Sequence, residues 1–278
     1  MGAAIRGIVV MAAAELDPEE REMLLQQTLD KLNAMRLCGM AEALKRWSDQ
    51  APQNADVSPA DLVGTLAESE WLYRENKKLT SRLRKAAFRE AACVEDIDYA
   101  HPRGLLKQTM IELTSCRWVA AKKNIILVGG TGLGKSYLAC ALGQKACRDG
   151  YVVIYRRVSR LFDELARARA DGTHAVLLRR LAKTQVLILD DFGPQPLTAT
   201  ERRELLEVFE DRYGISSTII TSQLDPNKWH GVIADDTLAD AICDRVVHNA
   251  HRIKLQGESM RKVKEKKEGL TKTTKSDK

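Results

Sequence analysis

A glycine-rich segment in the middle of the chain has the residue types needed to hold a polyphosphate. Residues 129–136, GGTGLGKS, match the pattern G-x-x-x-x-G-K-[ST] and follow the apolar run NIILV. Glycines let the backbone bend so that its N–H groups face phosphate oxygens, and a helix that begins here adds partial positive charge. We expect Lys135 to contact the β- and γ-phosphates of ATP and the Ser136 hydroxyl to ligate Mg²⁺. The residues expected to bind the nucleotide are Gly129, Gly130, Thr131, Gly132, Leu133, Gly134, Lys135, Ser136 and Tyr137.

A second acidic segment, LILDDFGP at 187–194, has three interpretations. Residues 190–193 match the DxxG pattern of GTPases, and residues 191–193 match the DFG triplet of protein kinases. The kinase interpretation fails because the chain has neither the kinase glycine loop nor an HRD-type catalytic loop. The GTPase interpretation fails at 227–230, NKWH, because His230 stands where the aspartate that recognises guanine belongs.

The third interpretation is an ATPase strand that ends in two carboxylates. Asp190 then holds the magnesium ion, and Asp191 polarises the attacking water. Most ATPases of this kind carry glutamate at the second position, so a slow base and a merely solvated acid both remain open for Asp191.

Two later segments could complete the site. The strand 217–223 is expected between the first strand and the strand at 186–191, where Gln223, or alternatively Ser222, would face the γ-phosphate. Arg245 could reach the γ-phosphate of a neighbouring subunit, since such an arginine stabilises transition-state charge. A plain surface ion pair with Asp244 is the alternative. The predicted catalytic residues are thus Asp191, Lys135, Gln223 and Arg245.

The elements that must position these side chains are short apolar runs that alternate with amphipathic stretches after residue 124. Runs that are apolar throughout are typical of parallel strands buried on both faces, and five of them predict a doubly wound α/β domain. The preceding residues, from about 15 to 118, are predicted to be helical apart from loops at 51–59 and 102–104. The expected division is a disordered N-terminus at 1–14, a helical DNA-binding domain at 15–105, an ATPase domain at 106–257 and a basic disordered tail at 258–278.

The bulk composition is that of a globular protein that can bind a polyanion. The 278 residues are 44% hydrophobic and 29% charged, with a net charge of +6. The six cysteines are scattered and form no CxxC pair, which argues against a paired-cysteine metal site and a small disulfide scaffold and indicates buried or incidental thiols in a reducing compartment. No apolar run approaches the roughly 18 residues that a membrane span needs. We therefore expect a cytoplasmic protein without membrane contact.

A cluster of positive charge lies at residues 71–89. Five of its residues are spaced by four, four, three and four, so a continuous helix would carry them as one stripe suited to DNA phosphates. A solvated basic face is the alternative. The candidate DNA-binding residues are Arg74, Lys78, Arg82, Lys85 and Arg89.

Several segments together resemble the IstB-like transposition helper ATPases of insertion sequences, which are AAA+ proteins akin to DnaC-type helicase loaders. The resemblance covers about residues 20–265 and depends on the following segments: TLDKLNAMRLCGMAEAL, WLYRENKKLTSRLRKAAF, GGTGLGKSYLACALG, LILDDFG, TIITSQL and DAICDRVVHNAHRIKLQGESMRK. It implies a P-loop NTPase of AAA+ type with a five-stranded parallel sheet, preceded by an all-helical domain. It also places Arg245 at the position of the trans-acting arginine.

The resemblance implies a protein that binds double-stranded DNA largely without sequence preference, forms a homo-oligomer and recruits a partner transposase. Too few residues follow 252–255 for the helical lid of other AAA+ proteins, so the lid arginine has no secure counterpart apart from Arg261. The leading hypothesis is an ATP-dependent transposition helper. A helicase loader and a DNA-binding adaptor with little hydrolysis are the alternatives, and a small-molecule kinase is a distant one.

Overall fold

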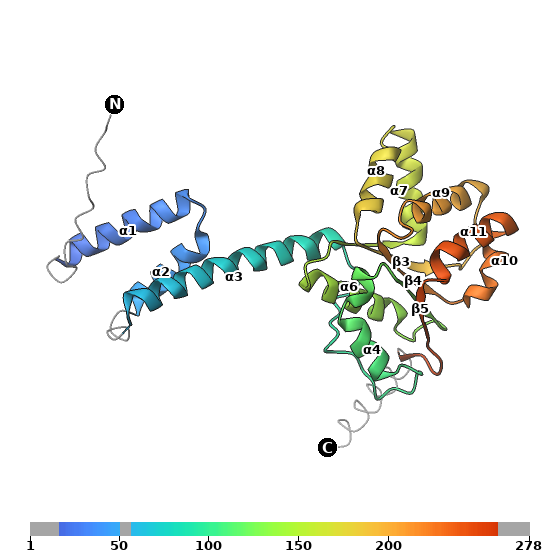
Figure 1. Ribbon diagram of the computed structural model, residues 1–278, viewed down its shortest axis with the longest axis horizontal. Coiled ribbons are helices and arrows are strands. Elements are labelled where there is room, and N and C mark those ends of the chain that lie inside the picture. Colours follow the sequence, from blue (N-terminus) through green and yellow to red (C-terminus); the bar gives the residue numbers. More distant parts are fainter. Residues whose placement is uncertain (1–16, 51–56, 261–278) are drawn as a thin grey trace, which may run out of the picture. The chain divides into compact units, whose positions relative to one another are not determined.

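The computed structural model describes residues 17–50 and 57–260 (Figure 1). The boundary between its two compact units lies between Lys78 and Leu79. The first unit contains α1 (Pro18–Ala34), α2 (Cys38–Asp49) and most of α3 (Pro59–Ala86), whose last turns belong to the second unit.

The first unit is held together where α2 begins. Gly39 lies so close to α3 that an added Cβ would be 2.6 Å from the Ser69 carbonyl oxygen and 2.7 Å from Tyr73 Cβ. The buried Glu70 carboxylate accepts hydrogen bonds from the N–H groups of Gly39 (2.7 Å) and Met40 (3.2 Å). These N–H groups lack partners within their own helix, so the carboxylate both satisfies them and complements the helix dipole.

The N-terminal part is less continuously helical than we predicted. Arg36 has a φ of 59° and separates α1 from α2, and residues 87–106 form no helix. This segment belongs to the second unit, and its residues Ala92 and Ile97 lie in the same core as the central strands. The compact second unit therefore begins before the boundary that we expected between residues 105 and 106.

The second unit contains the predicted five-stranded parallel sheet. Its strands are β1 (Asn124–Val128), β2 (Val153–Arg157), β3 (Val186–Phe192), β4 (Ser217–Ser222) and β5 (Ala250–Lys254). Every pair of neighbouring strands is parallel, and the order is β2-β3-β4-β1-β5. The strand at 217–222 thus lies between the first strand and the strand that carries Asp190, as expected.

Helices cover both faces of this sheet (Figure 1). Ile125 and Leu127 of β1 pack into one core, together with α6 (Lys135–Arg148), α4 (Lys107–Thr114) and α5 (Arg117–Ala120). Ile126 and Val128 pack into the other core. The helices that contribute to this second core are α7 (Val158–Ala170), α8 (His174–Lys183), α9 (Ala199–Glu210), α10 (Trp229–Ile233) and α11 (Asp236–Val247). Successive residues of a strand point to opposite faces, which explains why these strands are apolar throughout.

Parallel strands bring their carboxyl ends to one edge of the sheet, where ligands of α/β proteins bind. The glycine-rich segment follows β1, Asp190 and Asp191 lie at the end of β3, and Gln223 follows β4. The fold therefore gathers the predicted nucleotide-binding residues at one edge. Within residues 17–50 and 57–260, no helix has the length and apolar character that crossing a membrane requires.

The close approach at Gly39 gives a prediction for the first unit. Replacing Gly39 with alanine forces α2 and α3 apart, so we expect the free energy of unfolding to fall by about 1–3 kcal/mol. Gly64 is the matched control, since it lies inside α3 and an added Cβ meets no atom within 4 Å. Gly64→Ala should instead stabilise the helix by about 0.5–1 kcal/mol. Urea unfolding followed by circular dichroism measures both, and equal effects of the two substitutions would contradict the packing described here.

Candidate nucleotide site

The glycine-rich loop between β1 and α6 needs glycine for two physical reasons. At Gly129 an added Cβ would lie 2.5 Å from the Leu255 carbonyl oxygen, so the chain is too close for any side chain. Gly134 precedes α6 with a φ of +85°, and its added Cβ would lie 2.5 Å from a guanidinium nitrogen of Arg103. The loop is therefore fixed in a conformation that glycine tolerates and other residues do not.

Lys135, the first residue of α6, lies inside this loop. Its ammonium donates hydrogen bonds to the carbonyl oxygens of Gly129 (2.7 Å) and Gly130 (2.8 Å), and the residue is only 7% exposed. Burial lowers the pKa of Lys135, and the nearby carboxylates of Asp191 and Asp190 oppose that effect. A buried ammonium held by neutral carbonyls is well suited to accept a phosphate.

Asp190 brings together the two residues that we expected to hold magnesium. Its carboxylate is fully buried, and Oδ1 accepts hydrogen bonds from the hydroxyls of Ser136 (2.7 Å) and Thr221 (2.6 Å). Its Oδ2 accepts one from the Tyr155 hydroxyl (2.7 Å). Burial and this contact raise the pKa of Tyr155, so Tyr155 acts as a donor. Carboxylate and hydroxyl oxygens are suitable ligands for Mg²⁺, directly or through its water shell, so the side chains fit the ion.

Asp191 departs from the regular geometry of its strand. Its φ is 59°, and the pairing of β3 with β4 shifts between Leu189 and Phe192. Its N–H donates to the Thr221 hydroxyl (3.0 Å), and its Oδ2 accepts two hydrogen bonds from the Arg157 guanidinium, at 2.6 and 3.2 Å. Because successive strand residues normally point to opposite faces, this distortion turns Asp191 toward the pocket.

Gln223 also faces the nucleotide side of the loop. Its Oε1 accepts a hydrogen bond from the Thr131 hydroxyl (3.1 Å), and both residues line the pocket. Ser222, the alternative that we considered, is fully buried and donates to the Phe192 carbonyl oxygen (2.9 Å). The Ser222 hydroxyl therefore connects the ends of β3 and β4, and of the two residues it is Gln223 that lines the pocket, where a ligand can reach it.

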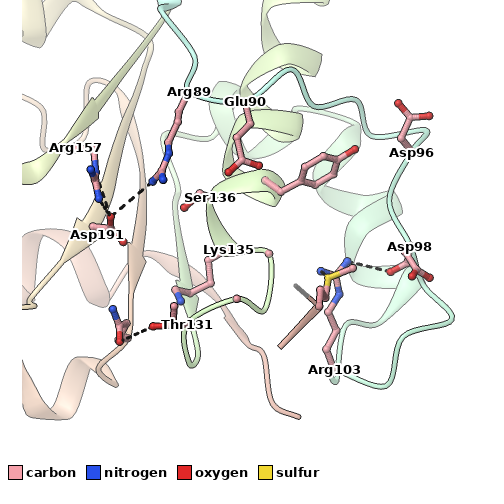
Figure 2. Close-up of a pocket in the computed structure, with 15 residues that line it drawn as sticks. Arg89, Glu90, Asp96, Asp98, Arg103, Thr131, Lys135, Ser136, Arg157 and Asp191 are labelled. Atoms are coloured by element: carbon pink, nitrogen blue, oxygen red, sulfur yellow. Dashed lines mark hydrogen bonds and ion pairs between the residues drawn. The ribbon is translucent and has the colours of Figure 1, made fainter. Parts of the chain in front are cut away.

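These side chains surround a pocket of about 510 Å³. Figure 2 shows Lys135, Ser136 and Asp191 on one side of it and Asp96, Asp98 and Arg103 on the other. The second group comes from the non-helical residues 87–106. The pocket residues that we did not assign to this site from the sequence are Arg89, Glu90, Asp96, Asp98, Arg103, Arg157 and Met260.

Arg103 joins this non-helical segment to the glycine-rich loop. It is 1% exposed, and its guanidinium donates to the carbonyl oxygens of Leu133 (2.9 Å) and Asp98 (3.0 Å) and to the Met260 sulfur (2.8 Å). Burial lowers the pKa of Arg103. No motif in the sequence signals this role, because the partners of the guanidinium are mostly backbone carbonyls.

The residues after β5 pack on the same loop. Leu255 N–H donates to the Val128 carbonyl oxygen (2.7 Å), and Met260 N–H donates to the Gly132 carbonyl oxygen (2.9 Å). Our expectation that a disordered tail begins at residue 258 is therefore wrong for residues 258–260, which pack on the site. Arg261 and the predicted disordered N-terminus lie outside the described residues.

Arg245 is not part of the pocket in its own chain. Its guanidinium lies 2.7 Å from Glu210 Oε1 and donates to the Ala241 carbonyl oxygen (2.8 Å). It borders a small cavity beside Asn124, the first residue of β1, and thus lies at the edge of the sheet opposite to the glycine-rich loop. It has an ion-pair partner, but that partner is Glu210 and not Asp244.

The predicted basic stripe is only partly present. Lys85 is exposed on α3, while Arg74 pairs with Glu70 and Lys78 pairs with Glu75. The stripe is interrupted at Arg82, whose half-buried guanidinium donates to the Cys147 carbonyl oxygen (2.9 Å).

Arg89 is not on the helix at all, because α3 ends at Ala86. It lies at the nucleotide pocket instead, so its predicted place in the stripe is wrong (Figure 2).

Comparison with known proteins shows relatives over almost the whole chain. The family model described as IstB-like ATP binding protein matches residues 30–268. The insertion sequence ATP-binding protein y4pL of Sinorhizobium fredii is 50% identical over 88% of this chain and 100% of its own length. The ATP-binding protein of insertion sequence IS1162 of Pseudomonas fluorescens is 43% identical over 73% of this chain and 87% of its own length.

Solved structures share the fold at low sequence identity. The crystal structure of DnaI has a TM-score of 0.51 and 23% identity, over 64% of this chain and 94% of that one. AMPPCP-bound DnaA from Aquifex aeolicus has a TM-score of 0.51 and 19% identity, over 65% of this chain and 55% of that one. These neighbours support the predicted AAA+ type of the P-loop fold and carry no further argument about function.

Proposed function

We propose that this chain, which belongs to the IstB-like ATP binding protein family, is an ATPase that assembles on DNA and recruits a partner transposase. The observation that carries the ATPase part is the convergence of three groups at one edge of the sheet. Lys135 lies inside the glycine-rich loop, Ser136 contacts Asp190, and Asp191 lies beside them at the pocket. This is the arrangement that phosphoryl transfer to water needs.

Each side chain of the site has a distinct role in hydrolysis. Lys135 would bind the phosphates, and Ser136 and Asp190 would hold Mg²⁺, which neutralises phosphate charge when it is bound. Asp191 would orient and polarise the attacking water, with Gln223 as a second group that contacts this water or the terminal phosphate. Both hydrogen bonds from Arg157 go to Asp191 Oδ2, so the other carboxylate oxygen, Oδ1, would be the one to polarise the water.

The partners are inferred from the relatives and from charge. Relatives that cover this chain are named as ATP-binding proteins of insertion sequences, which favours a transposase over a helicase as the client. The likeness to DnaI extends to the fold alone, so the helicase loader is the second candidate. Exposed basic residues on α3 supply a surface for the phosphates of double-stranded DNA.

The nucleotide site predicts the behaviour of two variants. Lys135→Ala removes the phosphate-binding ammonium, so the affinity for ATP should fall at least about 10-fold. Asp191→Asn keeps the shape of the side chain without its basicity, so ATP binding should persist while hydrolysis slows by about 10²-fold or more. Titration with a fluorescent ATP analogue and phosphate-release assays measure these effects. The control is Lys123→Ala, an exposed lysine outside the pocket, and unchanged binding by Lys135→Ala would refute the site.

The basic residues of α3 predict salt-dependent DNA binding. The logarithm of the affinity for duplex DNA should fall with the logarithm of salt concentration, by a slope of about −0.9 for each phosphate contacted. The double substitution Lys78→Ala, Lys85→Ala should reduce that slope by about 2 without changing sequence preference. Lys123→Ala with Lys183→Ala is the control of equal charge, because both lysines are exposed in the second unit. Equal slopes for both double variants would remove α3 from the DNA-binding surface.

Arg245 is proposed to act on the nucleotide of a neighbouring subunit. Arg245→Ala should then slow hydrolysis by about 10³-fold. Mixing it with Lys135→Ala should restore part of the activity, because the intact pocket of an Arg245→Ala subunit can then meet the intact Arg245 of a Lys135→Ala subunit. Glu210→Ala breaks the same ion pair but keeps the arginine, so it should retain activity. Equal losses in Arg245→Ala and Glu210→Ala, with no recovery on mixing, would mean that the pair is only structural.

A further inference from the structure

Arg89 is brought to the nucleotide pocket by the way α3 ends. Ala86 is fully buried and is the last residue of the helix, and Ala87 has a φ of 54°, which turns the chain. Phe88 then packs against the core beside Gly143 of α6, where an added Cβ would lie 2.8 Å from its ring. The packing of Phe88 therefore fixes the backbone of the next residue, Arg89, beside α6.

One nitrogen of the Arg89 guanidinium lies within ion-pair distance of both functional carboxylates. This nitrogen, Nη1, is 3.8 Å from Asp190 Oδ2 and 4.0 Å from Asp191 Oδ2, and the side chain is 39% exposed. Figure 2 shows the contact with Asp191. Arg157, in contrast, makes two hydrogen bonds to Asp191. Among the described residues, the Arg89 guanidinium has only the two longer ion-pair contacts with the carboxylates, so its N–H donors remain available on the side of the pocket where the metal and the terminal phosphate are expected.

The other cations of the pocket already have acceptors. Lys135 donates to two carbonyl oxygens, Arg157 to Asp191, and Arg103 to two carbonyl oxygens and a sulfur. A guanidinium presents its donors in a planar fork that matches phosphate oxygens, and such charge-assisted hydrogen bonds are strong. Arg89 is thus the pocket cation best prepared to exchange weak carboxylate contacts for phosphate contacts.

We propose that Arg89 binds the terminal phosphate of ATP and thereby links the end of α3 to the identity of the bound nucleotide. The inference rests on the proposed nucleotide site. ADP lacks the terminal phosphate, so with ADP bound Arg89 stays beside Asp190 and Asp191. With ATP bound, the segment that contains Arg89 gains a fixed partner.

The link has a thermodynamic consequence because α3 also carries Lys85, a candidate DNA-binding residue. A ligand that gives Arg89 a further fixed contact changes the free energy of the segment at the end of α3, and with it the affinity of that helix for a second ligand; the change is reciprocal. ATP and DNA therefore influence each other's binding through the few residues between Lys85 and Arg89.

The test compares Arg89→Ala with Arg84→Ala, an exposed arginine in the last turn of α3 that does not line the pocket. Affinities for AMPPCP, a non-hydrolysable ATP analogue, and for ADP are measured by displacement of a fluorescent nucleotide. Arg89→Ala should weaken AMPPCP binding by about 10- to 100-fold and ADP binding by less than about 3-fold. Arg89→Lys, which keeps the charge without the fork, should lie between the wild type and Arg89→Ala, and Arg84→Ala should match the wild type.

Hydrogen exchange gives a readout that does not depend on affinity. In the wild type and in Arg84→Ala, AMPPCP should protect the amides of residues 87–92 more than ADP does, and this difference should disappear in Arg89→Ala. Equal loss of affinity for both nucleotides, or an unchanged exchange difference, would overturn the inference. If Lys135→Ala also leaves nucleotide binding intact, the site itself is wrong; if only the Arg89 results fail, the site stands without this role.

Discussion

The interaction on which the site depends is the hydrogen bonding of the buried Asp190 carboxylate. A carboxylate removed from water is costly unless its oxygens are satisfied. Here three hydroxyls from three elements donate to it: Ser136 from α6, Tyr155 from β2 and Thr221 from β4. The same contacts fix the distance between the glycine-rich loop and the end of β3. One buried carboxylate therefore aligns the residues proposed to bind phosphate with those proposed to hold the metal.

The parts of the fold that the sequence predicted are those encoded by local pattern. Apolar runs predicted all five strands, and the motif at 129–136 predicted the loop and its helix. Gln223 could be placed because the position of its strand in the sheet follows from the fold class. Arg157 could also have been found, because it ends β2 and pairs in register with Asp190 at the same sheet edge.

The parts that the sequence did not predict depend on contacts between distant segments. Nothing in the spacing of the basic residues near 71–89 signals that Ala87 adopts a left-handed conformation, so Arg89 was assigned to a helical stripe that ends before it. Arg103 binds backbone carbonyls of the glycine-rich loop and of its own segment, which have no sequence signature. Residues 258–260 have a composition typical of a tail, yet Met260 is held by a hydrogen bond to Gly132.

The opposite placement of Arg245 and the glycine-rich loop has a consequence for symmetry. The two lie at opposite edges of one sheet, so an arginine that serves a neighbour's nucleotide cannot do so in a dimer whose partners face each other through the same surface. If Arg245 acts in trans as proposed, subunits would instead stack head to tail, giving a ring if the rotation closes and a filament if it does not. In a filament the two ends are unlike: one exposes a pocket without an arginine, and the other exposes an arginine without a pocket. Growth and loss of subunits would then have a direction along the DNA.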